Sequence, residues 1–149
     1  MFNNILVVCV GNICRSPSGE RVLQTLLPNK HIASAGIGAE KSRLVGKPAD
    51  EMATQVAAEH GVDLSNHHLL EQLRECVMVV GEYDLILVME KGHLEALTEI
   101  APEARGKTML FGQWIGQKEI PDPYRQSKEA FDYAYSLIEQ AAQAWAKKL

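Results

Sequence analysis

Cys9 and Arg15 are the residues whose types and spacing most directly suggest a reaction. They belong to the stretch C-V-G-N-I-C-R-S-P (9–17), in which five residues separate the thiol from the guanidinium. A planar guanidinium can bind two oxygens of a phosphate at once. A thiolate is a nucleophile that can attack phosphorus and form a covalent intermediate. The pair therefore predicts transfer of a phosphoryl group through a phosphocysteine.

The five residues between them are suited to bind the phosphate. Gly11 permits backbone conformations that other residues resist, and Asn12 tolerates a positive φ and can hydrogen-bond within the loop. A loop that leads directly into a helix aims backbone N–H groups at an anion, and the helix N-terminus adds a partial positive charge. The expected cradle consists of Val10, Gly11, Asn12, Ile13 and Cys14.

The positive surroundings of this cradle also favour the thiolate form of Cys9 near neutral pH. The hydroxyl of Ser16 could donate a hydrogen bond to that sulfur and make it a better leaving group in a second step. Taken alone, a cysteine at the end of an apolar strand is more often a small buried hydrophobic residue. The neighbouring glycine, asparagine, arginine and serine favour the catalytic interpretation.

Asp122 is the candidate for a general acid. The leaving oxygen of a phosphate ester needs a proton, which a carboxyl group on a nearby loop can supply. Asp122 lies in E-I-P-D-P-Y-R (119–125), where a proline on each side restricts its backbone. The same carboxylate could later take a proton from the water that hydrolyses the intermediate. An aspartate beside a proline is also common in turns, so the residue type alone fits that role too.

These residues need a scaffold that brings them to one place. Ile5–Val8 is an apolar run without polar alternation, as expected for a central parallel strand that is covered on both faces. Ser16 suits the N-cap, and Pro17 the first position, of a helix that ends before Pro28. Further strands are predicted at 31–36, 84–89 and 107–111, and further helices at 48–60, 94–100 and 127–149, whereas 69–82 fits either type.

Strands that alternate with helices at this spacing predict an α/β fold, with a parallel sheet flanked by helices on both faces. In such sheets ligands bind beyond the carboxyl ends of the strands, where the winding reverses. The loop that begins at Cys9 follows the first strand, and the loop of Asp122 follows the last one. Topology alone therefore predicts that both loops lie at the ligand-binding edge.

The composition is that of one globular domain, which we place at residues 1–149. Of the 149 residues, 46% are hydrophobic and 23% are charged, which is ordinary for a domain of this length. No stretch approaches the roughly 18 uninterrupted apolar residues of a membrane span, and the first strand does not read as a signal peptide. We therefore expect a cytoplasmic protein that is not membrane-embedded.

Charge and cysteine content argue against other classes. The formal net charge of −4 disfavours binding of nucleic acid, which usually requires a basic excess. Three cysteines are an odd number and do not suggest a disulfide framework. His67 and His68 have no partner at metal-ligand spacing, so we expect no metal.

The stretch C-V-G-N-I-C-R-S-P, followed about 110 residues later by D-P-Y, resembles the low-molecular-weight protein tyrosine phosphatases. It looks closest to the bacterial members that act beside tyrosine autokinases in capsule and exopolysaccharide production. The similarity covers essentially the whole chain and includes S-A-G (34–36), D-L-I-L-V-M (84–89) and G-K-T-M-L-F-G (106–112).

The resemblance implies a four-stranded parallel sheet, no cofactor, and hydrolysis of phosphotyrosine in a protein partner such as a tyrosine autokinase. It implies that Cys9 is the nucleophile, Arg15 the phosphate clamp and Asp122 the general acid. Asn12 and Ser16 would support the loop and the thiolate.

The resemblance also implies that Tyr124 and Leu44 line the substrate cleft. The segments 39–47 and 77–82 are longer than the family pattern, so the resemblance specifies the rim of the cleft less well.

Cys14 either packs as a thiol or forms a reversible disulfide with Cys9 that protects the nucleophile from over-oxidation. We expect the protein to be a monomer.

Two other functions could use the same loop. Some arsenate reductases share the fold and the Cys-x5-Arg loop, but they relay oxidation through two further cysteines, where this sequence has only Cys76. A non-catalytic phosphopeptide sensor would not need both Cys9 and an acid such as Asp122. Tyrosine phosphatase activity is therefore the favoured prediction.

Overall fold

Four parallel strands form the centre of the described part of the chain, as the alternation of strands and helices predicts. The structure is a computed structural model that describes residues 2–9, 15–36, 51–64, 83–123 and 126–149. The sheet has the order β2-β1-β3-β4, and every neighbouring pair is parallel. In chain order the strands are β1 (Asn4–Cys9), β2 (His31–Gly36), β3 (Leu85–Val88) and β4 (Thr108–Leu110).

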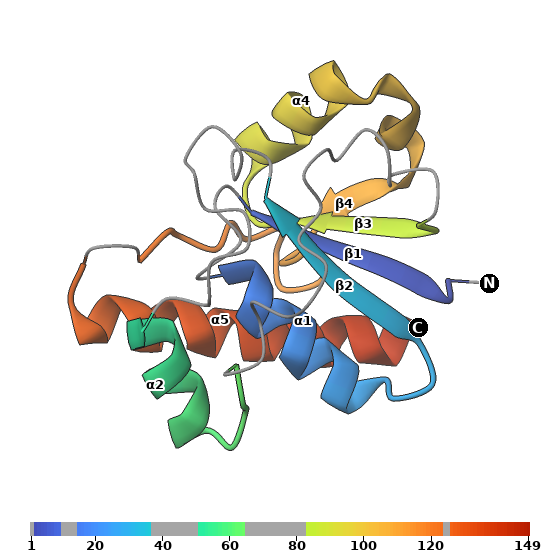
Figure 1. Cartoon of the computed structure of the whole chain (residues 1–149). Helices are drawn as coiled ribbons and strands as arrows, with labels where there is room; N and C mark the ends of the chain where they lie inside the picture. Colours follow the sequence, from blue (N-terminus) through green and yellow to red (C-terminus); the bar gives the residue numbers. More distant parts are fainter. Residues whose placement is uncertain (1, 10–14, 37–50, 65–82, 124–125) are drawn as a thin grey trace.

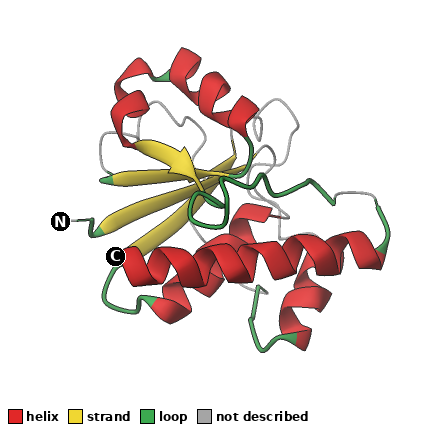
Figure 2. Ribbon diagram, turned by 180° about the vertical axis from the view of Figure 1, so that it is seen from behind, coloured by secondary structure: helices red, strands yellow, loops and turns green. Residues whose placement is uncertain are grey.

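Helices cover both faces of this sheet and give the molecule three layers (Figure 1). On one side lie α1 (Arg15–Leu26), α2 (Glu51–Glu59) and α5 (Lys128–Lys148). The other side carries α4 (Lys91–Ile100) and the short 3₁₀ helix η3 (Pro102–Lys107). Figure 2 shows the same layers from behind, with the long α5 running below the sheet. The predicted α/β sandwich is confirmed.

The strand β1 lies between β2 and β3, and both of its faces are buried, which explains why its sequence does not alternate. Its residues from Ile5 to Val8 are completely buried, and Cys9 is 3% exposed. Ile5, Val7 and Cys9 belong to the apolar cluster shared with α1, α2 and α5, whereas Leu6 and Val8 belong to the cluster shared with α4. Packing on both faces therefore holds the end of β1 in place.

The predicted elements are found with small shifts of their ends and two differences. α1 begins at Arg15, so Ser16 lies within its first turn and is not the N-cap. A proline at position 17 is tolerated there because the first N–H groups of a helix have no partner within it. The 3₁₀ helix η3 was not predicted, since so short a connector carries no apolar periodicity. The ambiguous segment 69–82 lies outside the described residues.

The order of the strands places the ligand-binding edge between β1 and β3. From β1 the chain moves outward to β2 and then returns to add β3 on the other side of β1. In sheets of this kind the crevice for ligands opens beyond the carboxyl ends of the two strands that flank the reversal. Cys9 ends β1, and Glu90 follows β3 after one intervening residue.

The connection from β4 to α5 crosses this edge and is held by hydrogen bonds to its backbone. The indole Nε1 of Trp145 donates to the carbonyl oxygen of Phe111 at 2.9 Å. Gly112 is required at the start of the loop, because a Cβ atom there would lie 2.1 Å from the carbonyl oxygen of Lys118.

Among the helices that the structure describes, none has the length and hydropathy to span a membrane.

Candidate active site

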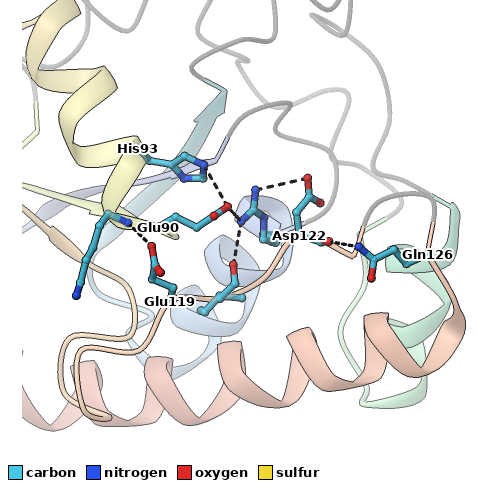
Figure 3. A network of polar contacts seen from close by, with 8 residues as sticks. Glu90, His93, Glu119, Asp122 and Gln126 are labelled. Atoms are coloured by element: carbon cyan, nitrogen blue, oxygen red, sulfur yellow. Dashed lines mark hydrogen bonds and ion pairs between the residues drawn. The ribbon is translucent and has the colours of Figure 1, made fainter.

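The guanidinium of Arg15 joins three elements at this edge, and its partners Glu90 and Asp122 are labelled in Figure 3. Arg15 is the first residue of α1 and is only 2% exposed. Its Nη1 donates to Glu90 Oε2 at 2.5 Å and to the carbonyl oxygen of Ile120 at 2.9 Å. Its Nη2 lies 3.7 Å from Asp122 Oδ2. One side chain thus connects α1 with the residue that precedes α4 and with the loop after β4.

This anchoring leaves one edge of the Arg15 guanidinium available. Glu90 and Ile120 occupy Nη1, whereas Nε is buried and has no hydrogen-bond partner among the described residues. The Nε–Nη2 edge presents two parallel N–H groups, the arrangement that two oxygens of a phosphate accept. Arg15 is therefore arranged to bind an oxyanion through that edge while Nη1 stays fixed.

The loop that carries Asp122 is fixed through its backbone. The amide of Ile120 donates to the carbonyl oxygen of Met89 at 2.9 Å. The side-chain amide of Gln126 donates to the backbone carbonyl oxygen of Asp122 at 3.1 Å. Ile120 is completely buried, and Pro123 is buried as well. The side chain of Asp122 is 48% exposed. The main chain is held in place while the carboxyl group reaches solvent beside Arg15.

Glu90 and His93 extend the polar group towards α4. Glu90 is the residue before α4, and its side chain is 37% exposed. His93 is buried, and its Nε2 lies 3.4 Å from the same Glu90 oxygen that accepts from Arg15. Burial, followed by the positive charge of Arg15, lowers the pKa of His93 from its ordinary value of 6.5. The imidazole is therefore neutral at pH 7.

Glu119 ties the loop of Asp122 to α4 as well. Its Oε2 accepts a hydrogen bond of 2.8 Å from the amide of Lys91, the first residue of α4. The positive end of the helix dipole favours a carboxylate at this position. The loop is thus fastened to α4 through Glu119 and to α1 through Arg15.

Cys9 lies at the strand end that precedes α1. It is buried, pairs with Gly36 in the register of β1 and β2, and belongs to the apolar cluster on the α1 side of the sheet. The other predicted site residues cannot be described in this way. Val10, Gly11, Asn12, Ile13, Cys14, Leu44 and Tyr124 lie outside the described residues, and of Ser16 only the backbone is described.

A small pocket borders Arg15 between α1, α2 and α5. Burial, followed by the negative charge of Glu139, raises the pKa of Tyr135 in its wall to about 12. The phenol therefore stays protonated and does not act as a base at neutral pH. Apart from Arg15 the wall offers little to a phosphate, since it consists of Ser18, Ala53, Val56, Pro123, Phe131, Ala134, Tyr135 and Ile138.

Glu90, His93 and Glu119 were not predicted from the sequence to be site residues. A signal for Glu90 was nevertheless present, because it directly follows the apolar run 84–89. The same pattern, a polar or reactive residue at the carboxyl end of an unalternating strand, pointed to Cys9. His93 and Glu119 carry no such signal, since their roles depend on contacts that only the fold creates.

Comparison with known proteins finds relatives along essentially the whole length of the chain. The sequence pattern of the family described as "Low molecular weight phosphotyrosine protein phosphatase" matches residues 4–149. Low molecular weight protein-tyrosine-phosphatase Wzb of Escherichia coli K12 is 55% identical over 149 residues, which cover 100% of this chain and 97% of that protein.

Two solved structures are also closely similar. The structure of Vibrio vulnificus Wzb in complex with benzylphosphonate has a TM-score of 0.94 and 74% identity and covers 100% of both chains. That of the tyrosine phosphatase Wzb from Escherichia coli K30 in complex with sulphate has a TM-score of 0.92 and 56% identity and covers 99% of both chains. The chain therefore belongs to the low molecular weight phosphotyrosine protein phosphatases and is a protein-tyrosine-phosphatase of that family.

Proposed function

We propose that the protein hydrolyses phosphotyrosine through a phosphocysteine on Cys9. The thiolate attacks phosphorus, the bond from phosphorus to the tyrosine oxygen breaks, and Asp122 protonates the departing oxygen. A water molecule then attacks the phosphocysteine and gives a proton to Asp122, and the sulfur–phosphorus bond breaks. The products are tyrosine and inorganic phosphate, and the enzyme returns to its starting state.

The observation that carries this proposal is the position of Arg15. Its Nη1 is anchored by Glu90 and Ile120, its Nε is unpartnered among the described residues, and its Nη2 is 3.7 Å from the carboxylate of Asp122. In this proposal the free edge binds two oxygens of the phosphoryl group, and Asp122 reaches the leaving oxygen beside them. A preorganised donor in a buried site stabilises the charge that develops on the phosphoryl oxygens.

The remaining predicted roles belong to the same proposal. Residues 10–14 cradle the phosphoryl group with backbone N–H groups, and Ser16 supports the sulfur as a leaving group. Tyr124 and Leu44 line the cleft beside the aromatic ring. Cys14 can form a disulfide with Cys9 under oxidation, which would protect the nucleophile.

An aromatic phosphate ester is the substrate class that we infer. The Vibrio vulnificus relative is described in complex with benzylphosphonate, whose ring and phosphonate correspond to the two ends of phosphotyrosine. We further propose that the physiological substrate is a tyrosine autokinase in capsule or exopolysaccharide production, on the strength of the resemblance to the bacterial members. A cytoplasmic location fits a catalytic thiol that must stay reduced.

Replacement of the nucleophile tests the proposal. Cys9→Ser should reduce hydrolysis of a phosphotyrosine peptide to the background rate, because a serine hydroxyl is not ionised in this cradle. The matched control is Cys76→Ser, which should retain full turnover. Equal turnover by wild type and Cys9→Ser would disprove the role of Cys9.

A further inference from the structure

His93 is a buried histidine whose two ring nitrogens have unequal surroundings (Figure 3). Its Nε2 lies 3.4 Å from Glu90 Oε2, whereas its Nδ1 is buried and has no hydrogen-bond partner within the described part of the chain. A carboxylate is an acceptor, so the nitrogen that faces it carries the proton. A second proton on Nδ1 would create a buried donor without an acceptor there, which is costly.

The protonation state of His93 matters because one oxygen of Glu90 serves two partners. Oε2 accepts a hydrogen bond of 2.5 Å from Arg15 and lies 3.4 Å from His93. The first contact is a charge-assisted hydrogen bond, which is about twice as strong as a neutral one. When the imidazole is neutral, Arg15 alone forms an ion pair with the carboxylate of Glu90. An imidazolium would form a second ion pair with this carboxylate and weaken its interaction with Arg15.

We propose that His93 is a positioning residue for phosphate binding. The neutral imidazole maintains the hydrogen bond between Arg15 and Glu90, and protonation of His93 loosens this anchor. His93 acts through Glu90 and does not itself contact the substrate. The inference rests on the proposed role of Arg15 as the phosphate clamp. It adds a residue in the first turn of α4 to the set that controls the reaction.

The charges that face His93 come from three parts of the fold. Arg15 on α1 opposes its protonation, while Glu90 before α4 and both Asp122 and Glu119 in the loop after β4 favour it. Burial of the ring and the charge of Arg15 outweigh the three carboxylates, so the pKa of His93 lies below 6.5. Loosening of the anchor is therefore expected on the acid side of neutrality.

The ratio of two pH profiles isolates this effect. The value of kcat/KM for p-nitrophenyl phosphate is measured from pH 7.5 to 4.5 for wild type and for His93→Gln, whose side chain is a neutral donor at every pH. Dividing one profile by the other cancels the ionisation of the substrate and of the groups that both enzymes share. The ratio of wild type to variant should be constant above pH 6.5 and fall at least about threefold by pH 4.5, a modest fraction of what one charged hydrogen bond contributes.

The matched control is His31→Gln, because His31 is exposed at the start of β2, the opposite end of the sheet from Cys9. The ratio of wild type to this variant should be flat over the whole range. A flat ratio for His93→Gln, or an equal fall for both variants, would overturn the proposal.

A second measurement on the wild-type protein covers the case in which His93→Gln fails to fold. Nitrogen-15 NMR of the imidazole should show a neutral ring protonated on Nε2 at pH 7. A charged ring, or a neutral ring protonated on Nδ1, would also overturn the proposal.

Arg15→Lys distinguishes a failure of the proposed phosphate clamp from a failure of the proposed role of His93. If this variant hydrolyses p-nitrophenyl phosphate like wild type, Arg15 is not the clamp and the underlying proposal fails. If it loses activity by orders of magnitude while the His93→Gln ratio is flat, only the inference about His93 fails.

Discussion

Asp122 and Arg15 lie 3.7 Å apart between Oδ2 and Nη2, yet their side chains are 48% and 2% exposed. The two proposed roles need this difference. A general acid must regain its proton in every turnover, which contact with water allows. A clamp stabilises charge best when it is withdrawn from water and already oriented.

The acid role makes a prediction that depends on the leaving group. Asp122→Asn should lower kcat/KM, which reports the steps up to departure of the leaving group, for a phosphotyrosine peptide by about 10²–10⁴-fold, the usual contribution of general acid catalysis. The loss should be much smaller for p-nitrophenyl phosphate, because p-nitrophenolate departs readily without a proton. The control Asp132→Asn changes a carboxylate on the surface of α5 and should leave both rates unchanged. Equal losses on the two substrates would mean that Asp122 supports the loop and does not supply the proton.

At the level of elements, a buried carboxyl group joins α1 to β2. The hydroxyl of Ser34 donates to Glu20 Oε1 at 2.6 Å, and both residues are 3% exposed. Burial raises the pKa of Glu20 above 4.5, although the Ser34 hydrogen bond and the charge of Arg21 partly oppose this. The contact connects the helix that begins with Arg15 to the strand that pairs with the end of β1.

This contact predicts how stability depends on pH. Because the folded state raises the pKa of Glu20, the folded protein binds that proton more tightly than the unfolded chain does. Its contribution to the free energy of unfolding is therefore greatest below about pH 4.5 and declines as pH rises through the folded-state pKa. Glu20→Gln removes this ionisation and keeps an acceptor for Ser34, so its stability relative to wild type should increase from pH 4.5 to 7.5.

Urea unfolding at several pH values measures this difference. The variant Glu95→Gln, at an exposed position of α4, serves as the control and should show a stability difference that does not change with pH. A difference between Glu20→Gln and wild type that is constant or shrinks with rising pH would contradict the account.

At the level of the whole molecule, the sequence predicted most of the helices and strands. It also predicted the site residues that lie close together in the chain. Unalternating apolar runs identified β1 and β3, and the period of Phe131, Tyr135, Ile138 and Trp145 identified the buried face of α5. Cys9 and Arg15 could be recognised together because only five residues separate them. The burial of Cys9 also follows from the apolar strand that it ends.

Contacts between distant segments could not be predicted in the same way. The hydrogen bond from Arg15 to Glu90 spans 75 positions, and that from Arg15 to the carbonyl oxygen of Ile120 spans 105. The position of Glu90 after the apolar run 84–89 marks it as a residue at the sheet edge, but it does not identify Arg15 as its partner. The second partner is a backbone oxygen, which no residue type specifies. The order of the strands brings β1 beside β3 and thereby creates the anchor of Arg15.

The phosphocysteine on Cys9 is the central claim, and trapping it is the most direct test. In Asp122→Asn the intermediate should accumulate, because the group that would accept a proton from water is missing. Rapid quenching during turnover of p-nitrophenyl phosphate, whose leaving group departs without a proton, followed by peptide mass spectrometry, should find one phosphoryl group on the peptide that contains Cys9. Turnover with no phosphorylated cysteine, or with the phosphoryl group on another residue, would contradict the account.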